Sequence, residues 1–218
     1  SRAAVVTSGQ RLVVPPLSTG RQFAGFVSEG ILHILSGYDH LAFLLTLLLP
    51  AVLARQRGEW QPLQHPRLGV AQILGIVTAF TAAHSITLSL SALGWMMPAS
   101  RWVEPVIAAS VLFAALNNVW PWVTTRVWAM TFGFGLIHGF GFAGALSELG
   151  LPQTGRLLSL LGFNLGVEIG QLAVVCAVLP LLFLLRGKRW YSQRAMPLLS
   201  IGIALMALVW LWQRLLPG

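Results

Sequence analysis

Long apolar stretches with almost no charged residues alternate along this chain with short polar segments. Each stretch has about 20 residues or more, the length that an α-helix needs to cross a hydrocarbon core of about 30 Å. We therefore predict an all-α fold, a polytopic bundle of transmembrane helices. The predicted spans cover, in order, residues 23–54, 68–93, 101–123, 127–149, 157–185 and 196–216.

Gly37 interrupts the first stretch and predicts a break or kink in its helix. The six spans become seven elements if the first is split there. Residues 1–22 mix Ser, Thr, Gly and Pro with short β-prone pieces, which indicates an extracytoplasmic tail or the end of a missing soluble region. Residues 23–218 then form one transmembrane domain.

Composition agrees with a membrane protein, because 56% of the residues are hydrophobic and only 9% are charged, against about 25% charged in ordinary soluble domains. The net charge of +8 comes from basic residues in the loops, where they orient a membrane protein. Nucleic-acid binding is therefore not expected. The single cysteine, Cys176, lies inside an apolar stretch and excludes a disulfide within the chain.

The loops also predict an orientation. If the N-terminus is outside, the inner loops carry eight basic residues and the short outer segments carry three, Arg101, Arg156 and Arg214. The eight inner residues are Arg55, Arg57, Arg67, Arg126, Arg186, Lys188, Arg189 and Arg194. The positive-inside rule therefore favours an extracytoplasmic N-terminus.

Ionisable residues inside the spans are the candidates for function, because they are costly in a membrane. In the predicted orientation they lie at similar depth, in the outer half of the bilayer. The candidate metal ligands are His33, Asp39, His40, His84, His138 and Glu168, and the supporting residues are Glu104, Asn164, Gln171 and Ser85.

His33 and His40 are seven residues apart, so a continuous helix would separate them by two turns, about 10 Å. That is too far for one ion, but a kink at Gly37 could gather both imidazoles with Asp39. Imidazole and carboxylate ligands suit Ni, Co, Zn or Fe. The alternative is a hydrogen-bonded polar kink that only stiffens the bundle.

Asn164, Glu168 and Gln171 are spaced four and three residues apart and form one polar stripe on the fifth span. Glu168 is a candidate ligand, proton carrier or general base, and the other two could simply join helices. Glu104 begins the third span, either as a charge favoured by the helix dipole or as a site residue. Ser85 is adjacent to His84.

Two further pairs of residues concern helix packing and a possible exit path for an ion. Gly135 and Gly139 form a small-xxx-small pair that allows close helix packing beside His138. Asn117 and Asn118 lie toward the inner side, where they either line an exit path or form hydrogen bonds between helices.

The motif His33-xxx-Gly37-x-Asp39-His40, followed by Leu-Ala-Phe-Leu-Leu, resembles the signature of the HupE/UreJ family. The resemblance extends to the segments around His84, Glu104, Asn117-Asn118, His138 and Asn164-Leu-Gly-Val-Glu168, and is similar to the longer subgroup with an extracytoplasmic N-terminal region. One departure is Ile34, where the hydrogenase-linked members usually have proline.

These membrane proteins are associated with hydrogenase and urease gene clusters and are regarded as nickel or cobalt permeases. The resemblance thus implies a multi-pass protein of the bacterial inner membrane, with a divalent metal ion (Ni, Co or Zn) as its ligand and metalloenzyme maturation proteins as partners.

Three functions follow as hypotheses. The first is a permease that holds a divalent transition metal at the histidines and releases it inward. The second is an intramembrane zinc hydrolase with Glu168 or Glu104 as general base, although the sequence lacks His-Glu-x-x-His. The third is a metal-binding accessory or sensory subunit.

Overall fold

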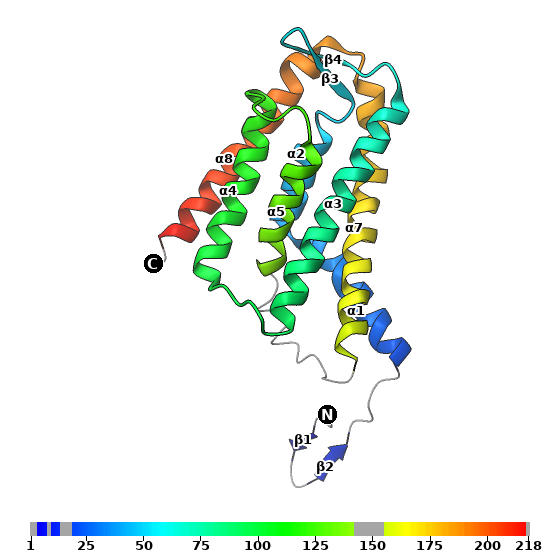
Figure 1. The fold of residues 1–218 in the computed structure, drawn as a ribbon, viewed down its shortest axis with the longest axis vertical. Coiled ribbons are helices and arrows are strands. Elements are labelled where there is room, and N and C mark those ends of the chain that lie inside the picture. Colours follow the sequence, from blue (N-terminus) through cyan, green and yellow to red (C-terminus); the bar gives the residue numbers. More distant parts are fainter. Residues whose placement is uncertain (1–3, 8–9, 14–18, 142–154, 217–218) are drawn as a thin grey trace.

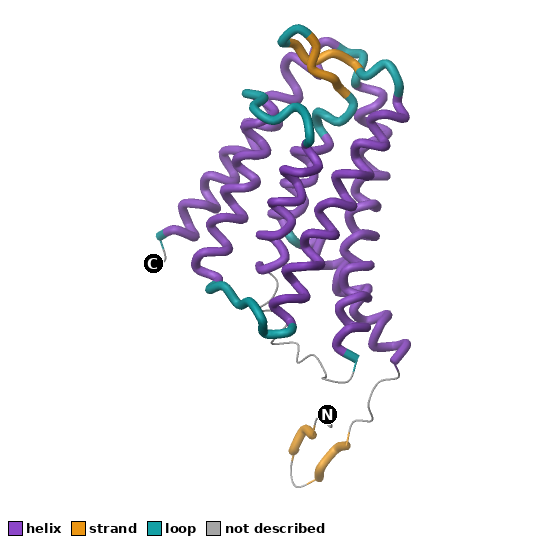
Figure 2. The backbone as a smooth tube through the Cα atoms, in the orientation of Figure 1, coloured by secondary structure: helices purple, strands orange, loops and turns teal. Residues whose placement is uncertain are grey.

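The computed structural model describes residues 4–7, 10–13, 19–141 and 155–216. The helices are α1 (Thr19–Ser36), α2 (Tyr38–Leu48), α3 (Pro66–Ala92), α4 (Ser100–Val119), α5 (Val127–Gly141), α7 (Arg156–Leu185), the π-helix η1 (Tyr191–Ala195) and α8 (Met196–Leu215). Two short hairpins pair β1 (Ala4–Thr7) with β2 (Gln10–Val13) and β3 (Leu53–Gln56) with β4 (Glu59–Pro62). The all-α prediction is confirmed, since helices make up nearly all of the bundle (Figure 2).

Four of the described helices, α3, α4, α7 and α8, are long and apolar enough to cross a membrane. The pair α1 and α2 also passes this test when it counts as one bent span, which gives up to five. The helix α5 is shorter, with 15 residues, and the predicted fourth span continues to residue 149, outside the described residues. The predicted count of six spans is therefore not confirmed, since the described helices give four or five candidate spans.

The first span is split at Gly37, as predicted, and α1 and α2 meet at an angle of 69°. Its predicted end at residue 54 was wrong, because α2 ends at Leu48. Pro50 follows in a turn and has no backbone N–H with which to continue a helix. The β3–β4 hairpin then occupies part of the predicted loop, and its two-residue turn has positive φ at Arg57 (50°) and Gly58 (85°).

Six of the helices pack in three pairs, and the short helix α2 lies between them. The helix α1 lies along α7, α3 along α5, and α4 along α8, while α2 contacts α1, α4, α7 and α8 (Figure 1). The first turn of α2, after the break at Gly37, is partly exposed, and the buried residues of this helix begin at Ala42. Because α2 contacts four other helices, side chains near this break can meet residues of several helices.

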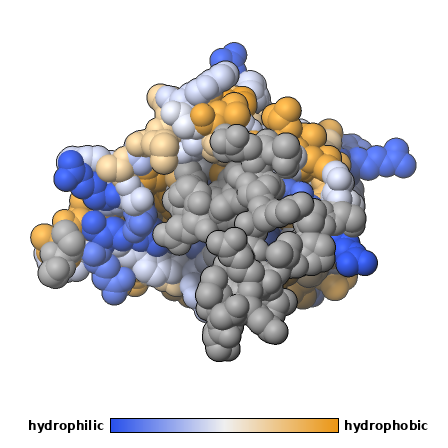
Figure 3. All heavy atoms as spheres, turned by 90° about the horizontal axis from the view of Figure 1, so that it is seen from below, coloured by the Kyte–Doolittle hydropathy of each residue, from blue (hydrophilic) through white to orange (hydrophobic). Residues whose placement is uncertain are grey.

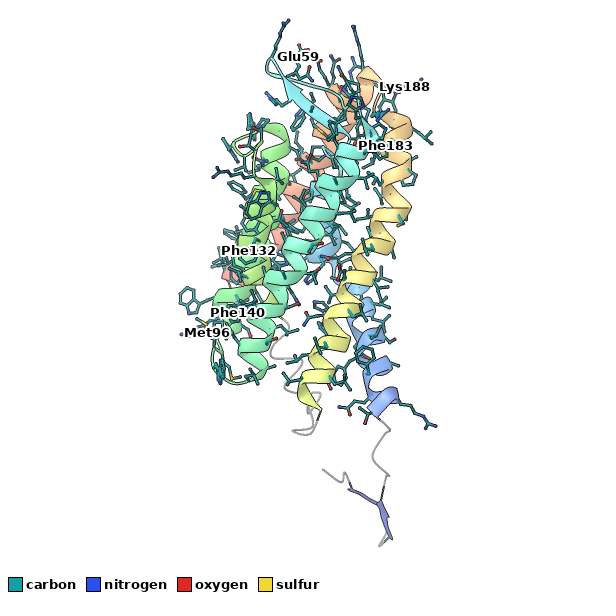
Figure 4. The ribbon with its side chains drawn as sticks, turned by 45° about the vertical axis from the view of Figure 1, so that its right-hand side comes forward. Glu59, Met96, Phe132, Phe140, Phe183 and Lys188 are labelled. Atoms are coloured by element: carbon teal, nitrogen blue, oxygen red, sulfur yellow. The ribbon has the colours of Figure 1, made fainter. Side chains whose placement is uncertain are left out.

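The predicted inner loops all lie at one end of the bundle, which we call the hairpin end because it holds β3 and β4 (Figure 1). Figure 4 shows Glu59 and Lys188 at this end and Met96 near the other end, where α1 begins. The inner loops that carry the basic residues thus share one end of the bundle, as a positive-inside arrangement requires. Figure 3 shows the opposite end, from below, with hydrophilic residues on its left, the side on which Figure 1 places the C-terminus.

The close approach of α3 and α5 depends on the predicted small residues. A Cβ atom at Gly135 would lie 2.7 Å from the carbonyl oxygen of Phe80, and one at Gly139 would lie 2.5 Å from that of His84. Real Cβ atoms do not approach backbone atoms so closely, so the two helices pack at a distance that only glycine allows here.

Substitution Gly139→Ala is expected to destabilise the protein by about 1–3 kcal/mol, the usual cost of overpacking. Gly133→Ala in the same helix is the matched control, because a Cβ there meets nothing within 4 Å and alanine favours a helix by about 1 kcal/mol over glycine. Thermal unfolding in detergent measures both variants. Equal melting temperatures for the two would contradict the proposed close packing.

Candidate metal centre

Three imidazoles from three helices converge at the break in the first span. His33 of α1, His40 of α2 and His84 of α3 each offer one ligand atom, and these atoms lie within 4.8 Å of one another. The ring centroids are 4.5 Å apart for His33 and His40, and 6.0 and 6.3 Å from His84 to these two. A small adjustment of side chains would bring all three to one ion.

The break at Gly37 creates this convergence. A continuous helix would hold His33 and His40 about 10 Å apart, whereas the bend brings the rings into contact. Glycine is required at the bend by space, because a Cβ atom there would lie 2.6 Å from the carbonyl oxygen of His33 and 2.8 Å from Nδ1 of His40. The motif thus encodes two candidate ligands and the kink that brings them together.

A fourth imidazole, His138 of α5, lies next to this group, with its ring 5.2 Å from that of His40. Its Nε2 is 2.9 Å from the hydroxyl of Ser110, and that hydroxyl donates its own hydrogen to the carbonyl of Ile107 at 2.7 Å. Ser110 is therefore left to accept from Nε2–H, which makes Nδ1 the nitrogen with a free lone pair. Such second contacts orient histidine ligands in metal sites.

Two of the imidazoles are buried and two, His33 and His40, are half-buried, and some of their nitrogens have no internal partner. His84 is 0% and His138 1% exposed. Nε2 of His40 and Nδ1 of His138 are buried and accept or donate no hydrogen bond within the part of the chain that the structure describes. Buried polar atoms normally have a partner, so these two nitrogens are suited to a ligand that the polypeptide does not supply.

Asp39 lies apart from the three imidazoles, although the sequence predicts it beside them. Its Oδ2 accepts a hydrogen bond of 2.8 Å from Arg214 in the last turn of α8. Consecutive residues on a helix point about 100° apart, so while His40 faces His33, the carboxylate of Asp39 faces α8.

The residues of the polar stripe on α7, Asn164, Glu168 and Gln171, make different contacts. Asn164 is adjacent to His84 and interacts with it, and the Asn164 amide donates to the carbonyl of Leu160 at 2.9 Å. Gln171 accepts from Thr81 at 2.9 Å and joins α7 to α3. Glu168 lies between them on the stripe and is half-buried, and it does not belong to the group of three imidazoles.

Two other predicted supporting residues lie outside the group. Ser85 donates to the carbonyl of Thr81, one turn before it in the same helix. Glu104 is exposed on α4, and its backbone carbonyl accepts from Arg214 at 3.2 Å. Neither residue belongs to the group of three imidazoles among the described residues.

The sequence reasoning missed two residues of this region, Ser110 and Arg214. Serine in an apolar helix has no distinctive pattern, and Ser110 is identified only by its contact with His138. Arg214 was counted as a basic residue of an outer segment. Its position in the last turn of a predicted span was the one signal that it could reach other membrane residues.

Comparison with known proteins agrees with the motif. A family model described as "HupE / UreJ protein" matches residues 9–214, nearly the whole chain. No curated protein and no solved structure matches the chain. The match includes the broken first span, the converging histidines and Arg214, and the chain therefore belongs to the HupE/UreJ family.

Proposed function

We propose that this protein is a permease for a divalent transition metal ion, nickel or cobalt, in the bacterial inner membrane. The observation that carries the proposal is the convergence of His33, His40 and His84 within 4.8 Å inside a helix bundle. Imidazole nitrogens bind Ni, Co and Zn, whereas Mg and Ca prefer oxygen ligands. Membership of the HupE/UreJ family favours nickel and cobalt over zinc.

The proposed path continues from the imidazoles to a cavity at the hairpin end. This cavity has a volume of about 310 Å³ and is lined by residues of α2 to α5 and the hairpin, including Leu47, Ile76, Met130 and Asn118. Asn117 and Asn118 both line it, and both form hydrogen bonds: Asn118 donates to Thr46 and Ser200, and Asn117 binds the loop at Val123. The cavity would receive the ion before its release.

A layer of three phenylalanines separates the imidazoles from this cavity. Three helices repeat one order, from a histidine to a phenylalanine about one turn away and then to an apolar residue of the cavity wall. The three series are His40, Phe43 and Leu47 on α2; His84, Phe80 and Ile76 on α3; and His138, Phe134 and Met130 on α5. The ring centroid of Phe43 is 5.5 Å from that of Phe80 and 5.8 Å from that of Phe134.

This phenylalanine layer would close the inner side of the metal centre. A hydrated ion does not pass a dry aromatic constriction unless the rings move apart. The arrangement therefore fits a state that is closed on the inner side, in which the ion is held at the imidazoles and the exit is shut.

The orientation of the permease follows from charge. The hairpin end carries the predicted inner loops with Arg55, Arg57, Lys188 and Arg189, and we place it in the cytoplasm. The N-terminus and the entrance are then extracytoplasmic. His84 lies in the last third of α3, which runs away from the hairpin end, so the metal centre is in the outer half.

The hydrolase hypothesis has less support. A zinc hydrolase needs a carboxylate base next to the metal-bound water, and the group of imidazoles includes neither Glu104 nor Glu168 among the described residues. A closed group of nitrogen ligands with an aromatic layer on one side fits an ion in transit better than a site that must admit a peptide or lipid.

Uptake of radioactive Ni²⁺ and Co²⁺ into proteoliposomes tests the proposed function. The purified protein should give time-dependent accumulation above that of protein-free liposomes, and excess unlabelled Ni²⁺ should suppress it. Metal binding without any uptake would overturn the permease and favour an accessory or sensory subunit.

Substitution Phe43→Ala is expected to raise the passive leak of Ni²⁺ through the protein several-fold, because it removes the ring that contacts both Phe80 and Phe134. The measurement is efflux from proteoliposomes preloaded with Ni²⁺. Phe132→Ala is the control in the same membrane domain, since Phe132 lies on α5 two residues before Phe134 and therefore points to nearly the opposite side of that helix. An unchanged efflux for Phe43→Ala would contradict the closing role of this layer.

A further inference from the structure

Arg214 joins three helices beside the metal centre. One of its nitrogens donates to Oδ2 of Asp39 at 2.8 Å, and the other donates to the backbone carbonyl of Glu104 at 3.2 Å. Its guanidinium also lies 5.9 Å from the ring of Trp210. Since α8 carries Arg214, α2 carries Asp39 and α4 carries Glu104, one side chain connects all three.

Only one of the two carboxylate oxygens of Asp39 takes part in this contact. Its Oδ1 is buried and has no hydrogen-bond partner within the described ranges. A carboxylate oxygen buried without a partner costs free energy. Asp39 also precedes His40 directly, so its backbone already lies at the metal centre, and a change of partner requires its carboxylate to turn away from α8.

The charge of a bound divalent ion gives Asp39 a reason to exchange Arg214 for the ion. Imidazoles that bind a metal are neutral, and the Asp39–Arg214 pair has no net charge. The positive charge of a divalent ion among these groups would therefore be uncompensated, and the guanidinium would repel the ion. If Asp39 left Arg214, its negative charge would face the ion, and the cost of holding the ion in the bundle would fall.

We propose that Arg214 is a built-in competing cation: it holds Asp39 while the centre is empty, and an arriving divalent ion displaces it from the carboxylate. This inference rests on the proposed function. Arg214 lies in the last turn of α8 with 24% of its side chain exposed, so its guanidinium has a path to the interface while its stem remains in place. The exchange also loosens the link between α2, α4 and α8, which couples binding to movement of the helices.

If Arg214 competes with the ion for Asp39, removal of its guanidinium should tighten the binding of Ni²⁺. The affinity for Ni²⁺ of the full chain in nanodiscs is measured by calorimetry for the wild type, Arg214→Gln, Asp39→Asn and the double variant. We expect Arg214→Gln to bind Ni²⁺ roughly tenfold tighter or more. The gain should be clearly smaller in the Asp39→Asn background, because the freed carboxylate is then missing. Lys188→Gln, which removes a positive charge at the hairpin end, is the control and should change nothing.

Each outcome of these affinity measurements either supports or overturns the proposed exchange. Equal gains in both backgrounds would show simple repulsion and overturn the exchange, as would an unchanged or weaker affinity of Arg214→Gln. If that variant does not fold, Arg214→Lys replaces it: lysine lacks the planar fork of arginine, so severalfold tighter binding supports the exchange and wild-type affinity overturns it. Absence of Ni²⁺ binding by the wild type would contradict the proposed function itself and is a distinct result.

Discussion

Replacing His40 by alanine is expected to weaken Ni²⁺ binding by about 100-fold or more and to abolish uptake. Changes to residues that only support a metal ligand already cost about 10–100-fold in affinity, and His40 is the central imidazole, with its ring 4.5 Å from that of His33 and 5.2 Å from that of His138. Calorimetry of the purified protein measures the affinity, and X-ray absorption of the bound Ni²⁺ reports whether nitrogen ligands are lost.

The matched control is His65→Ala. Of the five histidines in the chain, His65 is the one outside the cluster: it is exposed in the loop before α3. We expect wild-type affinity and uptake for this variant. If His40→Ala retained the wild-type affinity, or if both variants lost it equally, the metal could not be held at the broken span.

Substitution Gly37→Ala should separate the two histidines of the motif and weaken Ni²⁺ binding by roughly 10–100-fold, although every ligand remains. The added Cβ would lie 2.6 Å from the carbonyl oxygen of His33 and 2.8 Å from Nδ1 of His40, so both must shift. The expected loss is in affinity, and calorimetry with a parallel thermal unfolding experiment separates it from a loss of the fold.

Gly25→Ala is the control for this substitution, because it lies in α1 and a Cβ there meets nothing within 4 Å. Its affinity should equal that of the wild type, and its helix should be slightly more stable. A Gly37→Ala variant that binds Ni²⁺ as tightly as Gly25→Ala would contradict the idea that the kink assembles the site.

Much of the site was predictable because the motif is local. Gly37 lies between His33 and His40, and a break at a glycine is a local property of the helix, so the sequence indicated a joint site at this point. The phenylalanine layer was not predicted. Phe43, Phe80 and Phe134 lie in stretches where nearly every residue is apolar, and only helix packing selects the rings that face one another.

The class of protein, the broken first span and the candidate imidazoles were predictable from the order of residues, since hydrophobic length, a glycine break and the cost of ionisable groups in a membrane are all readable along one chain. Which of these groups meet could be seen only once the helices were packed together. Helix packing brings His84 beside His33 and His40, and it turns Asp39 toward Arg214, which is 175 positions away in the chain. The physical reason is that the partner of a side chain depends on the rotation and packing of separate helices, which contacts between distant residues set.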